Sequence, residues 1–207
     1  MLLALDQEGR ELPASRLAAE AGVSAATASA HLGKLVAGGL LRVETRGRFR
    51  LYRLSGPLVG TLLETMQSLA PPQPIRSLRQ STRAEALREA RTCYDHLAGR
   101  LGVALLSGML DGGFLEGDDG RDPEYRLTDR GLTFLAGFGV ELSPRRPAVR
   151  WCVDWTEQRH HLAGGLGRGL LDRLLQLDWL RRTPTSRAVE VTPRGARGLR
   201  ETFGIHL

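Results

Sequence analysis

The sequence has few of the features that mark a secreted or membrane-bound protein. It contains two cysteines, Cys93 and Cys152, in 207 residues, which is too few for a fold held together by disulfides. No apolar run approaches the roughly 20 residues that are needed to cross a bilayer. The short apolar start at residues 1–5 is cut off by Asp6 and Glu8, so no signal peptide is expected. We therefore expect a cytoplasmic protein whose two cysteines are either reduced structural thiols or functional ones.

Catalytic signatures are also missing. The sequence has no phosphate-binding loop, nucleophile elbow, H-E-x-x-H pair or dinucleotide fingerprint, so an enzyme is the least expected class of protein. Asp95 and Asp154 are the carboxylates that an acid–base enzyme would pair, and they keep that alternative open.

Lysine is nearly absent, because Lys34 is the only one in the chain. Arginine therefore supplies almost all of the positive charge behind the net charge of +6 and the pI near 10.3. A basic chain suits a polyanionic partner such as nucleic acid, although an arginine bias can also reflect genome composition. The position of the charges is therefore more informative than their total.

Residues 12–41 have the spacing of a helix-turn-helix, with two short helical patterns on either side of Gly22-Val23-Ser24. Gly22 stands where a left-handed C-cap is usually glycine, and Ser24 is a natural N-cap for the second helix. Val23 is expected to pack inward between the helices. Small and polar side chains on the second helix suit a DNA major groove. The expected DNA contacts there are Ser24, Ala25, Thr27, Ser29, His31 and Lys34.

A β-hairpin with a cationic tip is expected over residues 40–54. Between His31 and Arg53, six cationic residues stand against one acid, Glu44. Such a local excess indicates where a phosphate backbone lies. The expected DNA contacts from this wing are Arg46, Arg48 and Arg50. A winged helix that binds protein, or two hairpins inside another fold, would give the same pattern.

The order of these motifs resembles the ArsR-type bacterial transcriptional regulators. The resemblance rests on LAAEAGVS at 17–24, TASAHL at 27–32, GGLL at 38–41 and GRFRLY at 47–52, and it covers roughly residues 2–66. It implies a winged helix-turn-helix in a homodimer that binds an operator palindrome and is released by a ligand, often a soft or transition metal ion. A ligand-responsive dimeric repressor is therefore expected. Such proteins usually begin with one or two further helices, so residues 1–6 are expected to be the tail of a truncated helix.

Prolines divide the chain. We expect a DNA-binding domain over 1–70, a Pro-rich linker over 71–83 and a sensory and assembly unit over 84–207. A helix between Ser55 and the prolines carries an apolar stripe. The stripe fits the dimerising helix that the resemblance implies, and it equally fits an intrachain core. Its residues are Leu58, Leu62, Met66 and Leu69.

The C-terminal unit repeats itself. HLAGRLG at 96–102 recurs as HLAGGLG at 161–167, and YRLTDRG at 125–131 corresponds to VEVTPRG at 189–195. The copies lie near 93–140 and 152–205, and each ends near a Phe-Gly-aliphatic stop. We therefore expect two winged-helix-like copies about a pseudo-twofold axis. The expected fold class is mainly α with small β-hairpins, α+β.

The repeat brings two Cys-to-His pairs into equivalent settings. Cys93 precedes His96 by three residues, which predicts that both lie on one face of a helix, and Cys152 precedes His161 by nine. Thiolates and imidazoles are the ligands of zinc, cadmium and other soft divalent ions, so these four residues predict a tetrahedral metal site. Structural thiols, a thiol redox sensor and an organic effector between the two halves are the alternatives.

Overall fold

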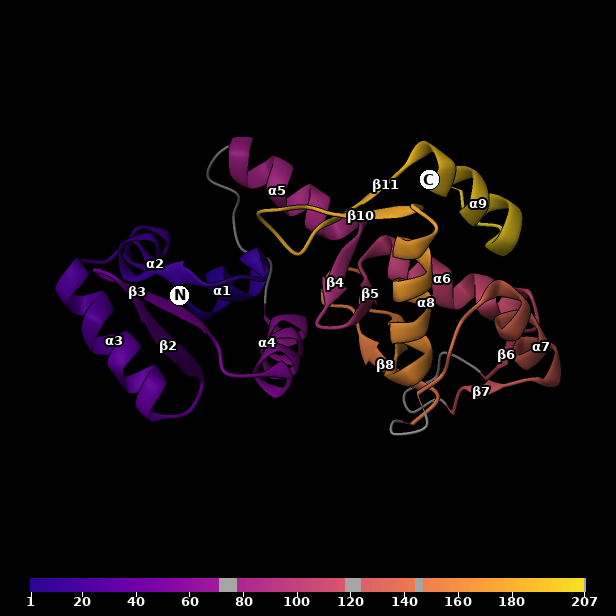
Figure 1. The fold of residues 1–207 in the computed structure, drawn as a ribbon, viewed down its shortest axis with the longest axis horizontal. Helices are drawn as coiled ribbons and strands as arrows, with labels where there is room; N and C mark the ends of the chain where they lie inside the picture. Colours follow the sequence, from indigo (N-terminus) through magenta and orange to yellow (C-terminus); the bar gives the residue numbers. More distant parts are fainter. Residues whose placement is uncertain (71–77, 118–123, 144–146, 207) are drawn as a thin grey trace. The chain divides into compact units, whose positions relative to one another are not determined.

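The computed structural model describes residues 1–70, 78–117, 124–143 and 147–206, and it divides the chain into two compact units (Figure 1). Unit 1 comprises Met1–Met66 with Pro184–Arg187, and unit 2 comprises Gln67–Thr183 with Ala188–Leu207. The fold class is the predicted one, since helices alternate with small antiparallel hairpins. Among the described residues, no helix is long and apolar enough to span a membrane.

Unit 1 has three helices before a β-hairpin and one after it. The helices are α1 (Leu2–Glu8), α2 (Ala14–Ala21), α3 (Ala25–Ala37) and α4 (Pro57–Leu69), and the last residues of α4, from Gln67 on, are assigned to unit 2. The hairpin consists of β2 (Leu41–Arg46) and β3 (Phe49–Leu54), and the short β1 (Leu12–Pro13) pairs with β3 to give the strand order β1-β3-β2. This is the architecture of a winged helix-turn-helix.

The turn between α2 and α3 forms as the sequence predicts, with one exception. Gly22 ends α2 at a φ of 63°, and the Ser24 hydroxyl oxygen accepts a hydrogen bond from the backbone N–H of Thr27. Val23 was expected between the helices, but that prediction is wrong because its side chain is 36% exposed. Fully buried Leu17 and Leu32 fill the core beneath the two helices instead.

The apolar residues of α4 separate into two sets. Val59 and Leu63 are buried, with exposed fractions of 9% and 6%. The predicted stripe is instead exposed and takes no part in a core cluster of the described residues. The exposed fractions are 83% for Leu58, 49% for Leu62, 58% for Met66 and 84% for Leu69.

The first helix that lies wholly in unit 2 is α5 (Leu78–Glu89), which starts inside the range that was predicted as a linker. The proline run at 71–74 lies outside the described residues. Two copies of one element order follow, each of them hairpin, helix, hairpin and helix. The first copy is β4 (Arg91–Cys93), β5 (His96–Ala98), α6 (Arg100–Asp111), β6 (Leu115–Glu116), β7 (Arg126–Leu127) and α7 (Asp129–Phe138). The second is β8 (Arg150–Val153), β9 (His160–Ala163), α8 (Gly164–Gln176), β10 (Leu180–Arg182), β11 (Val189–Val191) and α9 (Pro193–Phe203).

The two copies pack on each other reciprocally, in agreement with the expected pseudo-twofold arrangement. Helix α6 contacts β9, helix α8 contacts β5, and the two strands contact one another. A Cβ on Gly102 would lie 3.5 Å from the Cβ of His161, and a Cβ on Gly167 would lie 3.1 Å from the Cβ of His96. The two histidines therefore lie where each helix crosses the strand of the other copy. The contacts that exclude a side chain at these glycines are with the preceding strand, Leu97 O at 2.6 Å and Leu162 O at 2.4 Å.

Candidate functional site

The nine residues that were predicted to contact DNA are all exposed in unit 1. Six of them lie at the start of α3 or along it, and three lie on the β2–β3 hairpin (Figure 1). They are Ser24, Ala25, Thr27, Ser29, His31 and Lys34 on the helix, and Arg46, Arg48 and Arg50 on the hairpin. The side chains that a duplex would have to reach are thus accessible, while contact with DNA itself stays a prediction.

Arg46 and Arg48 of the hairpin differ in the interactions that they already make within the protein. Arg46 donates to Glu44 at 2.9 and 3.1 Å and also pairs with Glu11, so two acids partly neutralise it. The guanidinium of Arg48 lies 5.2 Å from the ring centroid of Phe49, and within the described residues it makes no ion pair. Arg48 is therefore the cation of the hairpin tip that is most available to a phosphate.

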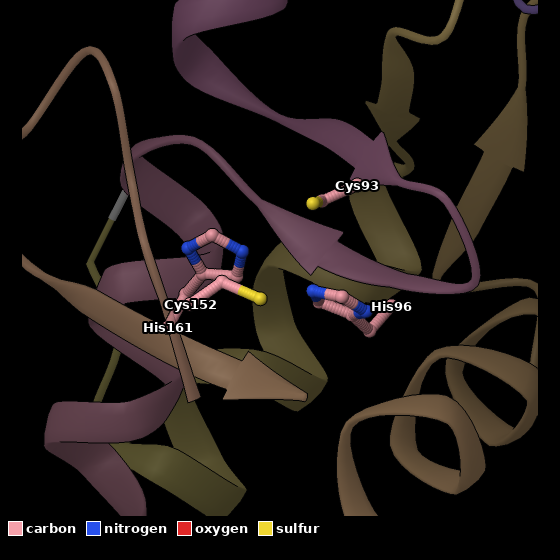
Figure 2. A group of neighbouring side chains, drawn as sticks. All are labelled: Cys93, His96, Cys152 and His161. Carbon is pink, nitrogen blue, oxygen red and sulfur yellow. The ribbon is translucent and has the colours of Figure 1, made fainter. Parts of the chain in front are cut away.

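The four predicted metal ligands come together in unit 2 (Figure 2). One ligand atom of each of Cys93, His96, Cys152 and His161 lies within 4.8 Å of those of the other three. Cys93 on β4 is the cross-strand partner of His96 on β5, and Cys152 on β8 is the partner of His161 on β9. Each copy therefore supplies one thiol and one imidazole from matching positions of its first hairpin.

The local structure of the first pair differs from the expectation. Cys93 and His96 were predicted to share a helix face, and this is wrong, because they face each other across a hairpin that turns at Tyr94 and Asp95. Tyr94 adopts a φ of 58°, which a helix does not contain. A spacing of three residues fits a helical turn and a two-residue hairpin equally, so the spacing alone could not decide.

The cluster is buried, and three of its four imidazole nitrogens have no hydrogen-bond partner among the described residues. Cys93 is 3%, His96 6% and His161 0% exposed, while Cys152 is half-buried, and neither cysteine is in a disulfide. The Nε2 atom of His96 and both ring nitrogens of His161 have no hydrogen-bond partner in the described structure. Leaving buried polar atoms unsatisfied costs free energy, and coordination of a metal ion would remove that cost.

A carboxylate lies behind each imidazole. Asp95 Oδ1 is 3.3 Å from His96 Nδ1, and Asp154 Oδ2 is 3.7 Å from His161 Nδ1. A histidine that binds a metal through one nitrogen commonly has a carboxylate or carbonyl near the other, which fixes the ring. The arrangement therefore leaves Nε2 of both rings as the natural donor toward the centre of the cluster.

The second carboxylate also joins the two copies. Asp154 is fully buried and accepts hydrogen bonds from Arg91 Nη2 at 3.0 Å, from the Gly99 backbone N–H at 2.6 Å and from Thr156. Arg91 is fully buried as well, and its guanidinium lies 4.8 Å from the ring centroid of Trp155. Sequence reasoning missed Arg91. Its position two residues before Cys93 would have placed both on one face of a strand, had a strand been predicted.

Protonation follows from these surroundings. Burial acts to lower the pKa of His96, but the neighbouring Asp95 carboxylate and Cys93 sulfur outweigh it and raise that pKa to about 9. Burial lowers the pKa of His161, and the neighbouring His96 lowers it further, so His161 is neutral. Burial would raise the pKa of Asp154, but Arg91 and the hydrogen bonds to the carboxylate lower it. The unloaded cluster thus has one protonated and one neutral imidazole.

Comparison with known proteins bears on both units. Residues 1–44 match a family described as a helix-turn-helix domain. The chain is 38% identical over 199 residues to the HTH-type transcriptional regulator YdfF of Bacillus subtilis (strain 168). The aligned part covers 94% of this chain and 86% of that protein, so the similarity extends far beyond the helix-turn-helix. No solved structure matched the chain.

Proposed function

Because this chain belongs to the family of HTH-type transcriptional regulators, we propose that it is a dimeric repressor controlled by a metal ion bound in unit 2. The family makes it a DNA-binding regulator of transcription. The observation that carries the metal part is the convergence of two thiols and two imidazoles in a buried cluster. Repression is the simplest mechanism, because a protein bound to its operator blocks access of RNA polymerase to the promoter.

The operator contacts come from α3 and the tip of the β2–β3 hairpin. The exposed face of α3 carries Thr27, Ser29 and His31, which are small or planar enough to enter a major groove and can donate to base edges or phosphates. Arg48 at the tip binds the phosphate backbone beside that groove. Base contacts therefore come from the helix, while the hairpin contributes affinity that depends on salt.

The donor set selects the class of metal. Two sulfur and two nitrogen ligands suit a tetrahedral ion such as zinc or cadmium. Two thiolates balance the charge of a divalent ion, and neutral imidazoles add none, so the buried complex is neutral. The nearby pair of Arg91 and Asp154 is neutral as well. A divalent ion therefore avoids the cost of burying net charge, which a monovalent ion would leave at the site.

The second copy in the dimer binds along α4. Leu58, Leu62 and Met66 recur every four residues and are exposed on one face, which suits packing against the same helix of another chain. A twofold pair would set two α3 helices about one DNA turn, roughly 34 Å, apart. Leu62→Glu should then shift the protein from dimer to monomer in sedimentation velocity. Leu132→Glu is the matched control, since Leu132 on α7 is 50% exposed and lies outside the stripe.

The metal response is tested by anisotropy of labelled DNA from upstream of the protein's own gene. The metal-free protein should bind this DNA specifically, and zinc or cadmium should weaken binding by roughly 5–150-fold, the usual range of allosteric coupling. Cys93→Ser with Cys152→Ser should bind DNA like the metal-free parent and ignore metal. His206→Gln, an exposed histidine outside the cluster, should respond like the parent.

Three results would overturn parts of this proposal. Specific DNA binding that zinc and cadmium leave unchanged would remove the metal response and favour an organic or redox signal. Equal zinc affinity in the parent and the double serine variant would show that the ion binds elsewhere. Absence of specific DNA binding would favour a winged helix that binds protein.

A further inference from the structure

The two sulfur atoms of the cluster are close enough to react with each other. Cys93 Sγ and Cys152 Sγ lie within 4.8 Å and come from different hairpins, one in each copy (Figure 2). A disulfide bond is about 2.05 Å long, so rotation of the two side chains has to close the remaining gap. Strand pairing to His96 and His161 holds each cysteine at its position while this happens.

We propose that Cys93 and Cys152 form a reversible disulfide when the protein meets a peroxide, which makes the cluster a redox-modification site that excludes metal. The loss of metal rests on the proposed function, whereas the disulfide itself requires only the two thiols. Metal binding and disulfide formation compete for the same sulfur atoms. The cluster therefore has two mutually exclusive states.

The two cysteines have different roles in the reaction because their exposure differs. Cys152 is half-buried and Cys93 is 3% exposed, so peroxide reaches Cys152 first. The Cys152 thiolate attacks one peroxide oxygen, the O–O bond breaks, and a sulfenic acid and hydroxide form. The Cys93 thiolate then attacks that sulfur, forms the S–S bond and expels a second hydroxide. Two electrons leave the sulfurs, and two protons from solvent convert both hydroxides to water.

Loss of the thiolates removes half of the ligand set. A disulfide sulfur is a poor ligand for zinc or cadmium, because these ions bind the thiolate. The two remaining imidazoles do not complete a tetrahedral site, so a bound ion leaves. A dithiol that reduces the disulfide regenerates both thiolates and the site with them.

The test uses the full chain with and without zinc, treated with hydrogen peroxide. We expect the thiol titre to fall from two to none per chain, the intact mass to fall by two hydrogens, and zinc to pass to a coloured chelator. Dithiothreitol should restore both thiols and zinc binding. In Cys93→Ser the sulfenic acid of Cys152 has no partner, so dimedone should trap it there but should trap little in the parent.

Three outcomes would overturn the proposal. They are a stable sulfenic or sulfinic acid on Cys152 of the parent beside an intact Cys93 thiol, two thiols that peroxide does not change, and a disulfide that a non-reducing gel shows only between chains. Zinc binding without the disulfide would reject this inference and keep the metal proposal. A disulfide within a chain that binds neither zinc nor cadmium would keep this inference and reject the metal proposal.

Discussion

Replacing Asp154 by asparagine should destabilise unit 2 strongly. Asparagine keeps the shape of the side chain but removes the negative charge that faces Arg91, and both side chains are fully buried. Arg91 Nη2 and the Gly99 N–H both donate to Oδ2 of Asp154. An amide nitrogen at that position would face two donors, and an amide oxygen would accept their bonds without balancing the charge of Arg91.

The expected cost is about 3–5 kcal/mol in the free energy of unfolding, which is the usual effect of leaving one partner of a buried ion pair alone. Domains of this kind are typically stable by about 5–15 kcal/mol, so the loss is a large fraction of the total. Replacing Arg91 by methionine in the same chain should recover part of the loss, because no buried charge is then left unpaired.

Urea unfolding followed by circular dichroism and tryptophan fluorescence measures this effect, since Trp155 lies against Arg91. The matched control is Asp178→Asn, because Asp178 pairs with Arg181 at the surface and its loss should not shift the midpoint measurably. A change below about 1 kcal/mol for Asp154→Asn would refute the reasoning, because an unpaired buried charge costs more than that.

Three further predictions concern packing, DNA and pH. Gly167→Ala should destabilise the protein by about 1–3 kcal/mol, because the new Cβ would collide with the backbone carbonyl of the preceding strand. Gly137→Ala is the control: a Cβ there would have nothing within 4 Å, so this variant should be neutral or stabilising. Thermal unfolding of the two variants compares these effects. Arg48→Ala should lower the slope of log affinity for DNA against log salt by about 0.9, and Arg46→Ala by less because two acids already hold it. Equal slopes for the two variants would contradict this assignment. The metal-free protein should lose stability as pH rises from 6.5 toward 9. The reason is that His96 has a pKa of about 9 in the folded protein, so it keeps a proton that the unfolded chain releases near 6.5. Urea titrations in chelator across this pH range should show a decline in the free energy of unfolding, and a flat profile would contradict the prediction.

Much of unit 1 could be predicted because its signals are local. A glycine at the end of α2 and a serine at the start of α3 act through the backbone of their own turn, so the sequence alone indicates them. Val23 failed because its burial depends on what fills the space between two helices, and Leu17 and Leu32 already fill the core there. The exposure of the α4 stripe is likewise a tertiary property, since periodicity identifies an apolar face but not what covers it.

In the unit 2 cluster, the sequence predicted which residues come together but not the elements that carry them. The repeat register related Cys93 to Cys152 and His96 to His161, and this relation holds whether the residues lie on helices or strands. The structure indeed brings the four together from strands. The repeat did not indicate the buried role of Arg91. Its equivalent in the second copy, Arg150 on β8, is also an arginine but is exposed. A repeat predicts what its copies share and not where they have diverged.

That divergence gives the two copies unequal parts in one site. The first hairpin turns through Tyr94 and Asp95, while the second makes a longer turn that begins at Asp154. Both turns nevertheless place a carboxylate beside the Nδ1 atom of their histidine. A single hairpin offers one thiol and one imidazole, which is half of a tetrahedral set. Any ion or disulfide at the cluster must therefore join the two copies, so its binding energy stabilises their docking and depends on it.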